Sequence, residues 1–188
     1  MRRRGLADPV LGTTDGASGL VRAFKECFHK SLRQRCLVHK KRNILGKVPQ
    51  EDVEVVKAHL NAVYYAPDLE SGEREAELFI EKFQDMYPSA VKCFKEELGA
   101  CLNHLRCPVR HRKTISSTNL LERAFEEEKR RSKVLPRFFD EKSCLKLVFA
   151  SLLRASCGWR GMHITFNEKL ELMKLRKELG PLLEDLHE

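Results

Sequence analysis

The longest regular feature of the sequence is helical periodicity from residue 50 to residue 106. Apolar residues recur there every three or four positions, with breaks at residues 67–72 and 87–88. Such spacing buries one face of a helix, so the run predicts three amphipathic helices packed as a small bundle. The three apolar stripes are Val53, Val56, Leu60, Val63 and Tyr64; Phe79, Ile80, Phe83 and Met86; and Val91, Phe94, Leu98, Cys101, Leu102 and Leu105.

The residues before this run predict an α/β unit. Residues 9–15 have the pattern of a short strand that ends in Asp15, and a turn rich in Gly and Ser leads into a helix. A second short strand is expected within residues 31–39, followed by a basic helix at residues 40–45. The crossover between the strands is long enough to make them parallel. Asp15 then lies where α/β sheets place ligand-binding groups, at the carboxyl end of a strand.

A further helix is predicted at residues 118–131, after a basic connector at residues 107–116. Residues of the N-cap type precede it, and neither Gly nor Pro interrupts it. Leu121 and Phe125 are spaced to share a buried face. Downstream, residues 144–155 predict a buried helix, and a charge-balanced helical tail begins near residue 168.

Glu122 and Lys129 lie seven residues apart on the predicted helix. Two helical turns advance the chain about 10 Å and return it to nearly the same side of the helix. The helix therefore presents a carboxylate and a cation along one line, which suits a site that holds Mg²⁺ and grips a phosphodiester. The alternative is a solvated helix of mixed charge.

Charge is distributed unevenly along the chain. Residues 1–50 contain 12 Lys and Arg against 3 Asp and Glu, residues 51–100 contain 5 against 12, and residues 101–150 contain 12 against 6. Two basic blocks that flank an acidic middle favour contact with a polyanion through the flanks. Candidate phosphate contacts are Lys40, Lys41, Arg42, Arg130 and Arg131, for which a solvated helix end is the alternative.

The composition also bears on the cellular compartment. No apolar run approaches the roughly 20 residues that span a bilayer, and residues 1–9 lack the apolar core of a signal peptide. We therefore expect no membrane association and a cytoplasmic location. The seven cysteines have no framework-like spacing, so reduced thiols are expected.

Four motifs occur in an order that resembles the Mutator-type insertion-sequence transposases, over about residues 5–180. The resemblance places this chain against the C-terminal portion of such a transposase. The motifs are Thr14-Asp15-Gly16-Ala17-x-Gly19-Leu20, Arg35-Cys36-Leu37-Val38-His39, Thr118-Asn119-Leu120-Leu121-Glu122-Arg123 with Glu128-Lys129-Arg130-Arg131, and Pro136-Arg137-Phe138-Phe139-Asp140-Glu141-Lys142-Ser143.

The resemblance implies a DDE enzyme with a ribonuclease-H-like core and a helical insertion before the last acid. Such enzymes bind two Mg²⁺ ions, hydrolyse DNA at transposon ends and join the 3′-hydroxyls to target DNA. Matched by motif, Asp15 corresponds to the second acid, Glu122 to the third, and Lys129 to a basic residue that contacts DNA. Cys36 and His39 match a motif with a structural or mechanistic role.

Combined with the patterns, this predicts an α/β fold with a large helical insertion, mostly α-helical, around a partial ribonuclease-H-like core with a short parallel sheet. Four segments are expected. They are the partial core at 1–49, the acidic helical insertion at 50–106, a return to the core at 107–160, and a helical tail at 161–188.

The family's first acid has no counterpart here. It belongs on a strand well upstream of Asp15, and only 14 residues precede Asp15. We therefore expect an incomplete Mg²⁺ ligand set, and a truncated copy that is inactive by itself. The partners expected are DNA at transposon ends and targets, with a second copy or a full-length transposase as a further partner. The alternative function is a non-catalytic DNA-binding or assembly module that acts on full-length transposase.

A zinc site is the other metal chemistry that the sequence offers. Cys36-x-x-His39 and Cys101-x-x-His104 repeat one spacing, and four such ligands suffice for a tetrahedral site. Spacing of this kind also arises by chance, and the apolar residues between Cys36 and His39 indicate strand packing. We therefore do not expect zinc.

Overall fold

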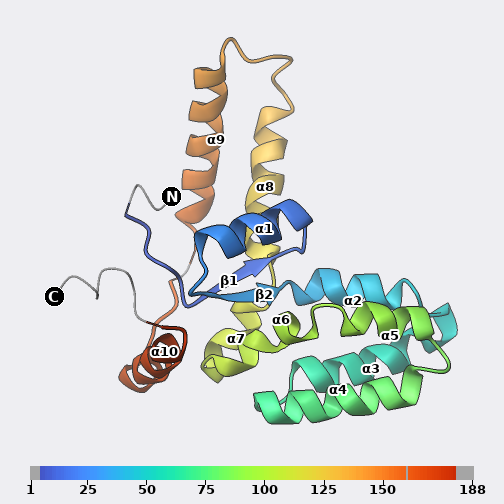
Figure 1. Cartoon of the computed structure of the whole chain (residues 1–188). Coiled ribbons are helices and arrows are strands. Elements are labelled where there is room, and N and C mark those ends of the chain that lie inside the picture. The colour runs from blue at the N-terminus through green and yellow to red at the C-terminus, as the bar shows by residue number, and fades with distance from the viewer. Residues whose placement is uncertain (1–4, 160, 181–188) are drawn as a thin grey trace. The chain divides into compact units, whose positions relative to one another are not determined.

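The computed structural model describes residues 5–159 and 161–180. It is mostly helical, with one two-stranded parallel sheet, as the sequence predicts (Figure 1). The chain divides into two compact units. The first extends to Ser117 and resumes at Ile164, and the second comprises Thr118–His163.

The sheet pairs β1 (Leu11–Thr14) with β2 (Leu32–Arg35) in parallel. The strands are joined by α1 (Ser18–Cys27), which confirms the predicted crossover. Helix α1 approaches the sheet closely through Phe24, because a Cβ added to Gly12 of β1 would lie 2.3 Å from the Phe24 ring.

The second strand is shorter than predicted. It ends at Arg35, and α2 (Leu37–Leu45) begins two residues later with Cys36 at its N-cap. Val38 and His39, expected on a strand, therefore lie on a helix. The apolar positions Leu37 and Ile44 are seven apart and both buried, a helical spacing that the sequence interpretation overlooked.

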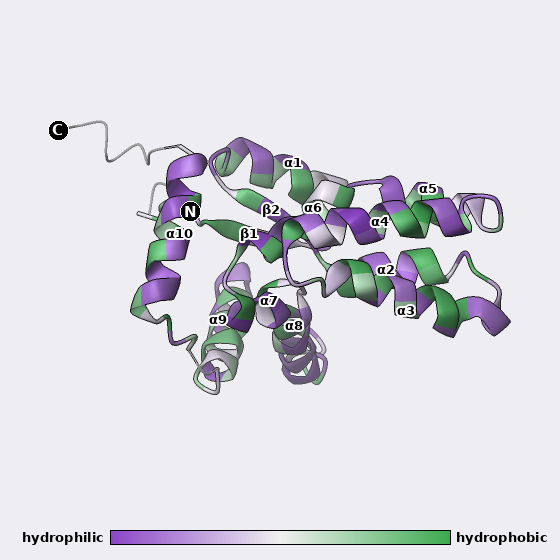
Figure 2. Ribbon diagram, turned by 90° about the horizontal axis from the view of Figure 1, so that it is seen from below, coloured by the Kyte–Doolittle hydropathy of each residue, from purple (hydrophilic) through white to green (hydrophobic). Residues whose placement is uncertain are grey.

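The segment 50–106 is helical and forms the main hydrophobic core. Its helices are α3 (Val53–Tyr64), α4 (Leu69–Phe83), α5 (Pro88–Lys95) and α6 (Leu98–Leu102), with 3₁₀ turns at Gln50–Asp52 and Asn103–Arg106. Figure 2 shows hydrophilic and hydrophobic residues alternating along these helices. The largest fully buried core side chains include Tyr64, Phe79, Phe94, Ile44 and Leu60.

The third predicted helix is broken, which corrects the expectation of three continuous helices. Helix α5 ends at Lys95, and Glu97 has φ +61°, the left-handed conformation, before α6 begins. A non-glycine residue in this conformation interrupts a helix and is held there by its surroundings. Met86, predicted on the second stripe, is 54% exposed.

The end of the insertion is hydrogen-bonded to β2. The side-chain amide of the buried Gln34 donates to the backbone carbonyl of Cys101 at 3.0 Å. It also accepts from the backbone N–H of His104 at 2.8 Å. Asn103 donates to the Arg33 carbonyl at 3.0 Å. The last of these bonds occupies a backbone carbonyl of β2 that another strand would otherwise use.

The segment expected as a basic connector contains a helix, α7 (Val109–Ile115). The helical tail is confirmed as α10 (Phe166–Glu178), whose Arg176 donates to the backbone carbonyls of Lys30 and Asp8. Gly180, at the expected break, has φ +93°. The part of the tail at 181–188 lies outside the described residues.

The second unit contains α8 (Asn119–Ser132) and α9 (Glu141–Ser156), which pack against each other. Asp140 caps α9 by accepting from the Ser143 amide at 2.6 Å. The prediction that Leu121 and Phe125 form a buried face of α8 is wrong, because these side chains are 48% and 51% exposed. Helix α9 is also less buried than predicted, and Ser151 is its one fully buried residue.

None of the helices in the described part of the chain combines the length and apolar character needed to span a bilayer.

Candidate functional site

Asp15 follows the last residue of β1, at the carboxyl end of the sheet. Its side chain is exposed, and its Oδ1 accepts a hydrogen bond from the Ala17 amide at 3.0 Å. Gly16 between them has φ +87°, a conformation that side chains other than glycine rarely adopt. The chain thus turns sharply after the acid and enters α1, which leaves the carboxylate at the surface.

The buried Arg35 lies directly beneath this turn. A Cβ added to Gly16 would lie 2.2 Å from the Arg35 guanidinium carbon, so only glycine fits there without displacement. The Nη1 atom of Arg35 is buried and has no hydrogen-bond partner among the described residues. A buried cation therefore lies against Gly16, the residue that follows Asp15.

Glu97 of the insertion binds the two arginines of β2. Its Oε2 lies 3.3 Å from Nε of Arg35, and its Oε1 accepts a short hydrogen bond from Arg33. Both arginine side chains are at least nine-tenths buried, whereas Glu97 is about one-third exposed. Removing one partner of such a pair leaves a buried charge without compensation. Glu97 therefore adds ion pairs to the hydrogen bonds that already connect the insertion to β2.

Cys36 and His39 contact each other in the first turn of α2. The Sγ atom of the fully buried Cys36 lies 3.2 Å from Nδ1 of the half-buried His39. The contact agrees with the structural role that the motif resemblance implies, and that role remains a prediction.

The return segment of the first unit is held beside the same end of the sheet. Thr13 of β1 donates to the Ile115 carbonyl at 2.5 Å, and the Leu37 amide donates to the Ser116 carbonyl at 2.9 Å. Residues 115 and 116 are therefore anchored next to the carboxyl ends of both strands.

Glu122 lies in the first turn of α8, in the second unit. Its side chain is half-buried, and its Oε1 accepts a hydrogen bond from the Thr118 hydroxyl at 2.5 Å. Asp15 and Glu122 belong to different units, so their proximity stays a prediction.

The basic residues of α8 differ in their availability. Glu127 accepts hydrogen bonds from Arg130 at 2.9 Å and from Arg131 at 2.8 Å, and these arginines lower the pKa of Glu127 to about 2. Lys129 is exposed and has no ion pair within the described residues. A cavity of about 490 Å³ in this unit is lined by Arg130, Arg131 and Arg154.

The three residues of α2 predicted to contact phosphates also differ in how accessible they are. Lys40 is only 3% exposed and donates to the Glu96 carbonyl, so the structure does not offer it to a DNA backbone. The Lys41 ammonium donates to Asn61 at 2.6 Å and lies 4.3 Å from the Tyr65 ring centroid. Arg42 is exposed.

The second pair of candidate zinc ligands is Cys101 and His104, and His104 makes other contacts. His104 is buried with Nδ1 3.0 Å from the Cys101 carbonyl and Nε2 2.9 Å from the Tyr64 carbonyl. Both ring nitrogens thus face backbone oxygens. In this conformation His104 has no nitrogen available for zinc.

Sequence reasoning missed Arg33, Arg35 and Glu97. A signal was available in the sequence, because Arg33 and Arg35 fall on either side of Gln34 within the predicted strand, and charges on a strand that becomes buried need partners. Nothing in the sequence identified the partner, which lies more than 60 residues away.

Comparison with known proteins gives consistent results. The family described as "Transposase, Mutator family" matches residues 1–161. A transposase for insertion sequence element IST2 of Acidithiobacillus ferrooxidans is 30% identical over 164 residues, which is 87% of this chain and 55% of that protein. A transposase for ISRM5 of Rhizobium meliloti (strain 1021) is 32% identical over 177 residues, 93% of this chain and 44% of that protein. The chain thus spans about half the length of these relatives.

Proposed function

The chain belongs to the Mutator family of transposases, and we propose from this premise that it carries part of a metal-dependent site for DNA cleavage and strand transfer. Asp15 and Glu122 are the proposed metal ligands. β1, α1 and β2 are the proposed part of a ribonuclease-H-like core, supported by the parallel strands and their crossover helix.

The observation that carries the proposal is that Asp15 and the return segment at residues 115 and 116 lie at the same end of the sheet, the carboxyl end. The exposed Asp15 lies there, and residues 115 and 116 are hydrogen-bonded beside it. Glu122 follows Ser116 by six residues, and six residues of extended chain span at most about 20 Å. The covalent connection therefore limits how far Glu122 lies from this anchor.

The donor chemistry fits a hard divalent cation. Carboxylate oxygens are the protein ligands that Mg²⁺ prefers, and the exposed Asp15 carboxylate makes one hydrogen bond, to the Ala17 amide, among the described residues. When bound, the metal would polarise the phosphodiester and stabilise the developing charge. Gly16 and Arg35 orient the Asp15 turn, and Thr118 orients Glu122 through its hydroxyl.

DNA contacts are proposed for Lys129, Arg130, Arg131, Lys41 and Arg42. Lys129 and Arg42 are exposed. Such side chains neutralise phosphates and release counterions, which gives affinity that falls with salt. Pairing with a second copy or with full-length transposase remains a prediction.

The second candidate function is a non-catalytic DNA-binding or assembly module. It is favoured by the arginine-lined cavity between α8 and α9, which suits an anionic phosphate and needs no metal. The two candidates predict different roles for the carboxylates.

Binding of duplex DNA with and without Mg²⁺ separates them. If Asp15 and Glu122 hold a metal, Mg²⁺ raises the affinity, and both Asp15→Asn and Glu122→Gln abolish that increase. A non-catalytic module binds no more tightly with Mg²⁺ than without it, because Mg²⁺ competes for the phosphates, and the two substitutions leave its affinity unchanged or higher. Asp85→Asn, at an exposed acid of the insertion, is the matched control.

A further inference from the structure

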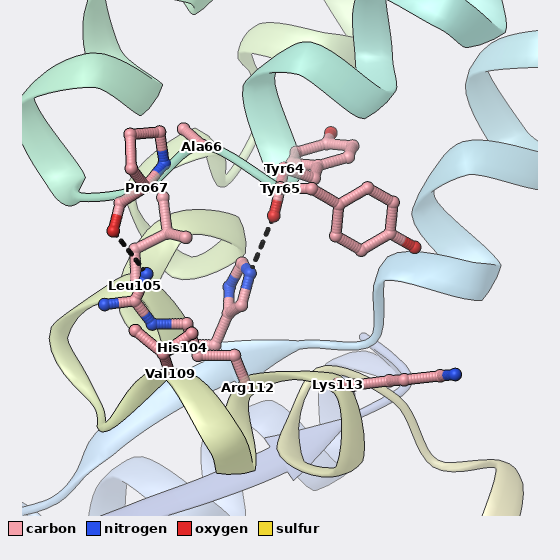
Figure 3. A pocket seen from close by; sticks show the side chains of 9 residues that line it. All are labelled: Tyr64, Tyr65, Ala66, Pro67, His104, Leu105, Val109, Arg112 and Lys113. Atoms are coloured by element: carbon pink, nitrogen blue, oxygen red, sulfur yellow. Dashed lines mark hydrogen bonds between the residues drawn. The ribbon is translucent and has the colours of Figure 1, made fainter.

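A second cavity lies in the first unit, at the C-terminal end of α3. It has a volume of about 420 Å³, within the range of small-molecule sites. Figure 3 shows Tyr65 and Lys113 on one side and Leu105 and Val109 on the other. No residue proposed above as a metal ligand lines it.

The floor and walls of the cavity are rigid and mostly apolar. His104 and Leu105 are buried, and the imidazole of His104 is fixed between two backbone carbonyls. Arg112 donates to the carbonyls of Cys107 at 2.8 Å and Pro67 at 2.7 Å, which fixes its position at the wall. An apolar cavity with fixed walls suits a flat, apolar group better than a hydrated ion.

The rim carries an exposed aromatic ring and several cations. Tyr65 is 62% exposed, and the Lys41 ammonium lies 3.1 Å from its hydroxyl. Lys113 is exposed at the cavity, and Arg112 lies beside it. Two acids, Asp68 and Glu171, interact with Arg112, and the Asp68 carboxylate also accepts from the Ser71 amide at the start of α4. This rim is basic although residues 51–100 as a whole are acidic, so charge complementarity selects an anionic ligand.

From this combination we propose that the cavity receives a nucleotide displaced from a DNA duplex. The base stacks on Tyr65 and enters the apolar cavity, while Lys113 at the cavity and Lys41, which lies beside Tyr65, contact the flanking phosphates. Stacking of a base on an aromatic side chain tolerates any base, and enzymes that extrude a base bind it in such a pocket. The proposal rests on the proposed function, because DNA is the source of the nucleotide.

The test compares two DNA duplexes that differ in one unpaired nucleotide. One is fully paired, and the other carries a single bulged 2-aminopurine, whose fluorescence falls on stacking. We expect the full chain to bind the bulged duplex about tenfold more tightly and to quench the bulged base. Tyr65→Ala should remove both effects and lower affinity for the bulged duplex far more than for the paired duplex, whereas Tyr65→Phe should retain both.

Met86→Ala removes an exposed apolar side chain that does not line the cavity, and it should retain the preference. Equal affinity for the two duplexes would overturn the proposal, and so would an equal loss on both duplexes in Tyr65→Ala. A deoxynucleoside monophosphate that competes as strongly as the bulged DNA would overturn it in favour of a free nucleotide. Failure to bind either duplex would instead contradict the DNA-binding function.

Discussion

At the residue scale, the candidate site depends on Gly16 more than on any other backbone position. Its φ of +87° sets the turn after Asp15, and the Arg35 guanidinium fills the space where a side chain would project. The sequence predicted a turn between Asp15 and the following helix. It did not reveal Arg35, because only the parallel register Thr14↔Arg35 brings that residue to the same end of the sheet.

Gly16→Ala should destabilise the fold by about 1–3 kcal/mol, because the new Cβ meets both a strained φ and a buried guanidinium. Gly19→Ala is the matched control. Gly19 lies in α1 with no atom within 4 Å of an added Cβ, so alanine should be neutral or stabilise by up to about 1 kcal/mol. Urea unfolding of both variants measures the difference, and equal stabilities would contradict this account of the turn.

Glu127→Gln should raise the affinity for duplex DNA about three- to tenfold at low salt. The substitution removes the carboxylate that now binds Arg130 and Arg131, and so frees two cations for phosphates. Glu126→Gln on the same helix removes an equal charge without releasing an arginine, so it should have the smaller effect. Fluorescence anisotropy across a salt series measures both. Identical gains in the two variants would show that net charge alone is responsible.

At the element scale, apolar periodicity identified α3 and α4 well and failed at α5 and α6. A stripe from Val91 to Leu105 continues through the break, because periodicity records which side chains are buried and not whether the backbone between them is helical. The break occurs at Glu97, which forms ion pairs with Arg33 and Arg35, and these contacts are distant in sequence. Strand β2 was overextended for a related reason, since Leu37 and Val38 fit a strand and a helix equally well.

His104 should make the stability of the insertion depend on pH. Burial lowers the pKa of His104 below its ordinary value of 6.5, so the folded chain binds fewer protons than the unfolded chain. The free energy of unfolding should therefore be greatest above pH 6.5 and decrease as the pH falls below it, by at most about 1.4 kcal/mol per unit.

Urea unfolding between pH 7.5 and 5.5 checks this expectation. His104→Gln should be less stable overall but should show a flatter pH dependence, whereas His29→Gln, at an exposed site, should retain the wild-type slope. The carboxylates with lowered pKa values titrate below this window. An unchanged slope in His104→Gln would rule out His104 as the source.

At the scale of the whole molecule, the two proposed ligands belong to different units. The family resemblance placed Asp15 and Glu122 in one site, and the structure gives each a defined local setting in its own unit. Sequence motifs identify such residues because their chemistry restricts residue type and order. They do not specify how two units are arranged, and the chain passes between these two units after residue 117 and again after residue 163.

The most direct test of the shared site is paramagnetic broadening by Mn²⁺, a substitute for Mg²⁺, in nuclear magnetic resonance spectra of the full chain. The account predicts that one bound ion broadens the amide signals around both Asp15 and Glu122. It also predicts that Asp15→Asn or Glu122→Gln alone abolishes the broadening around both residues. If each substitution removes only the broadening around its own position, or if Mn²⁺ affects neither, Asp15 and Glu122 do not share a metal ion.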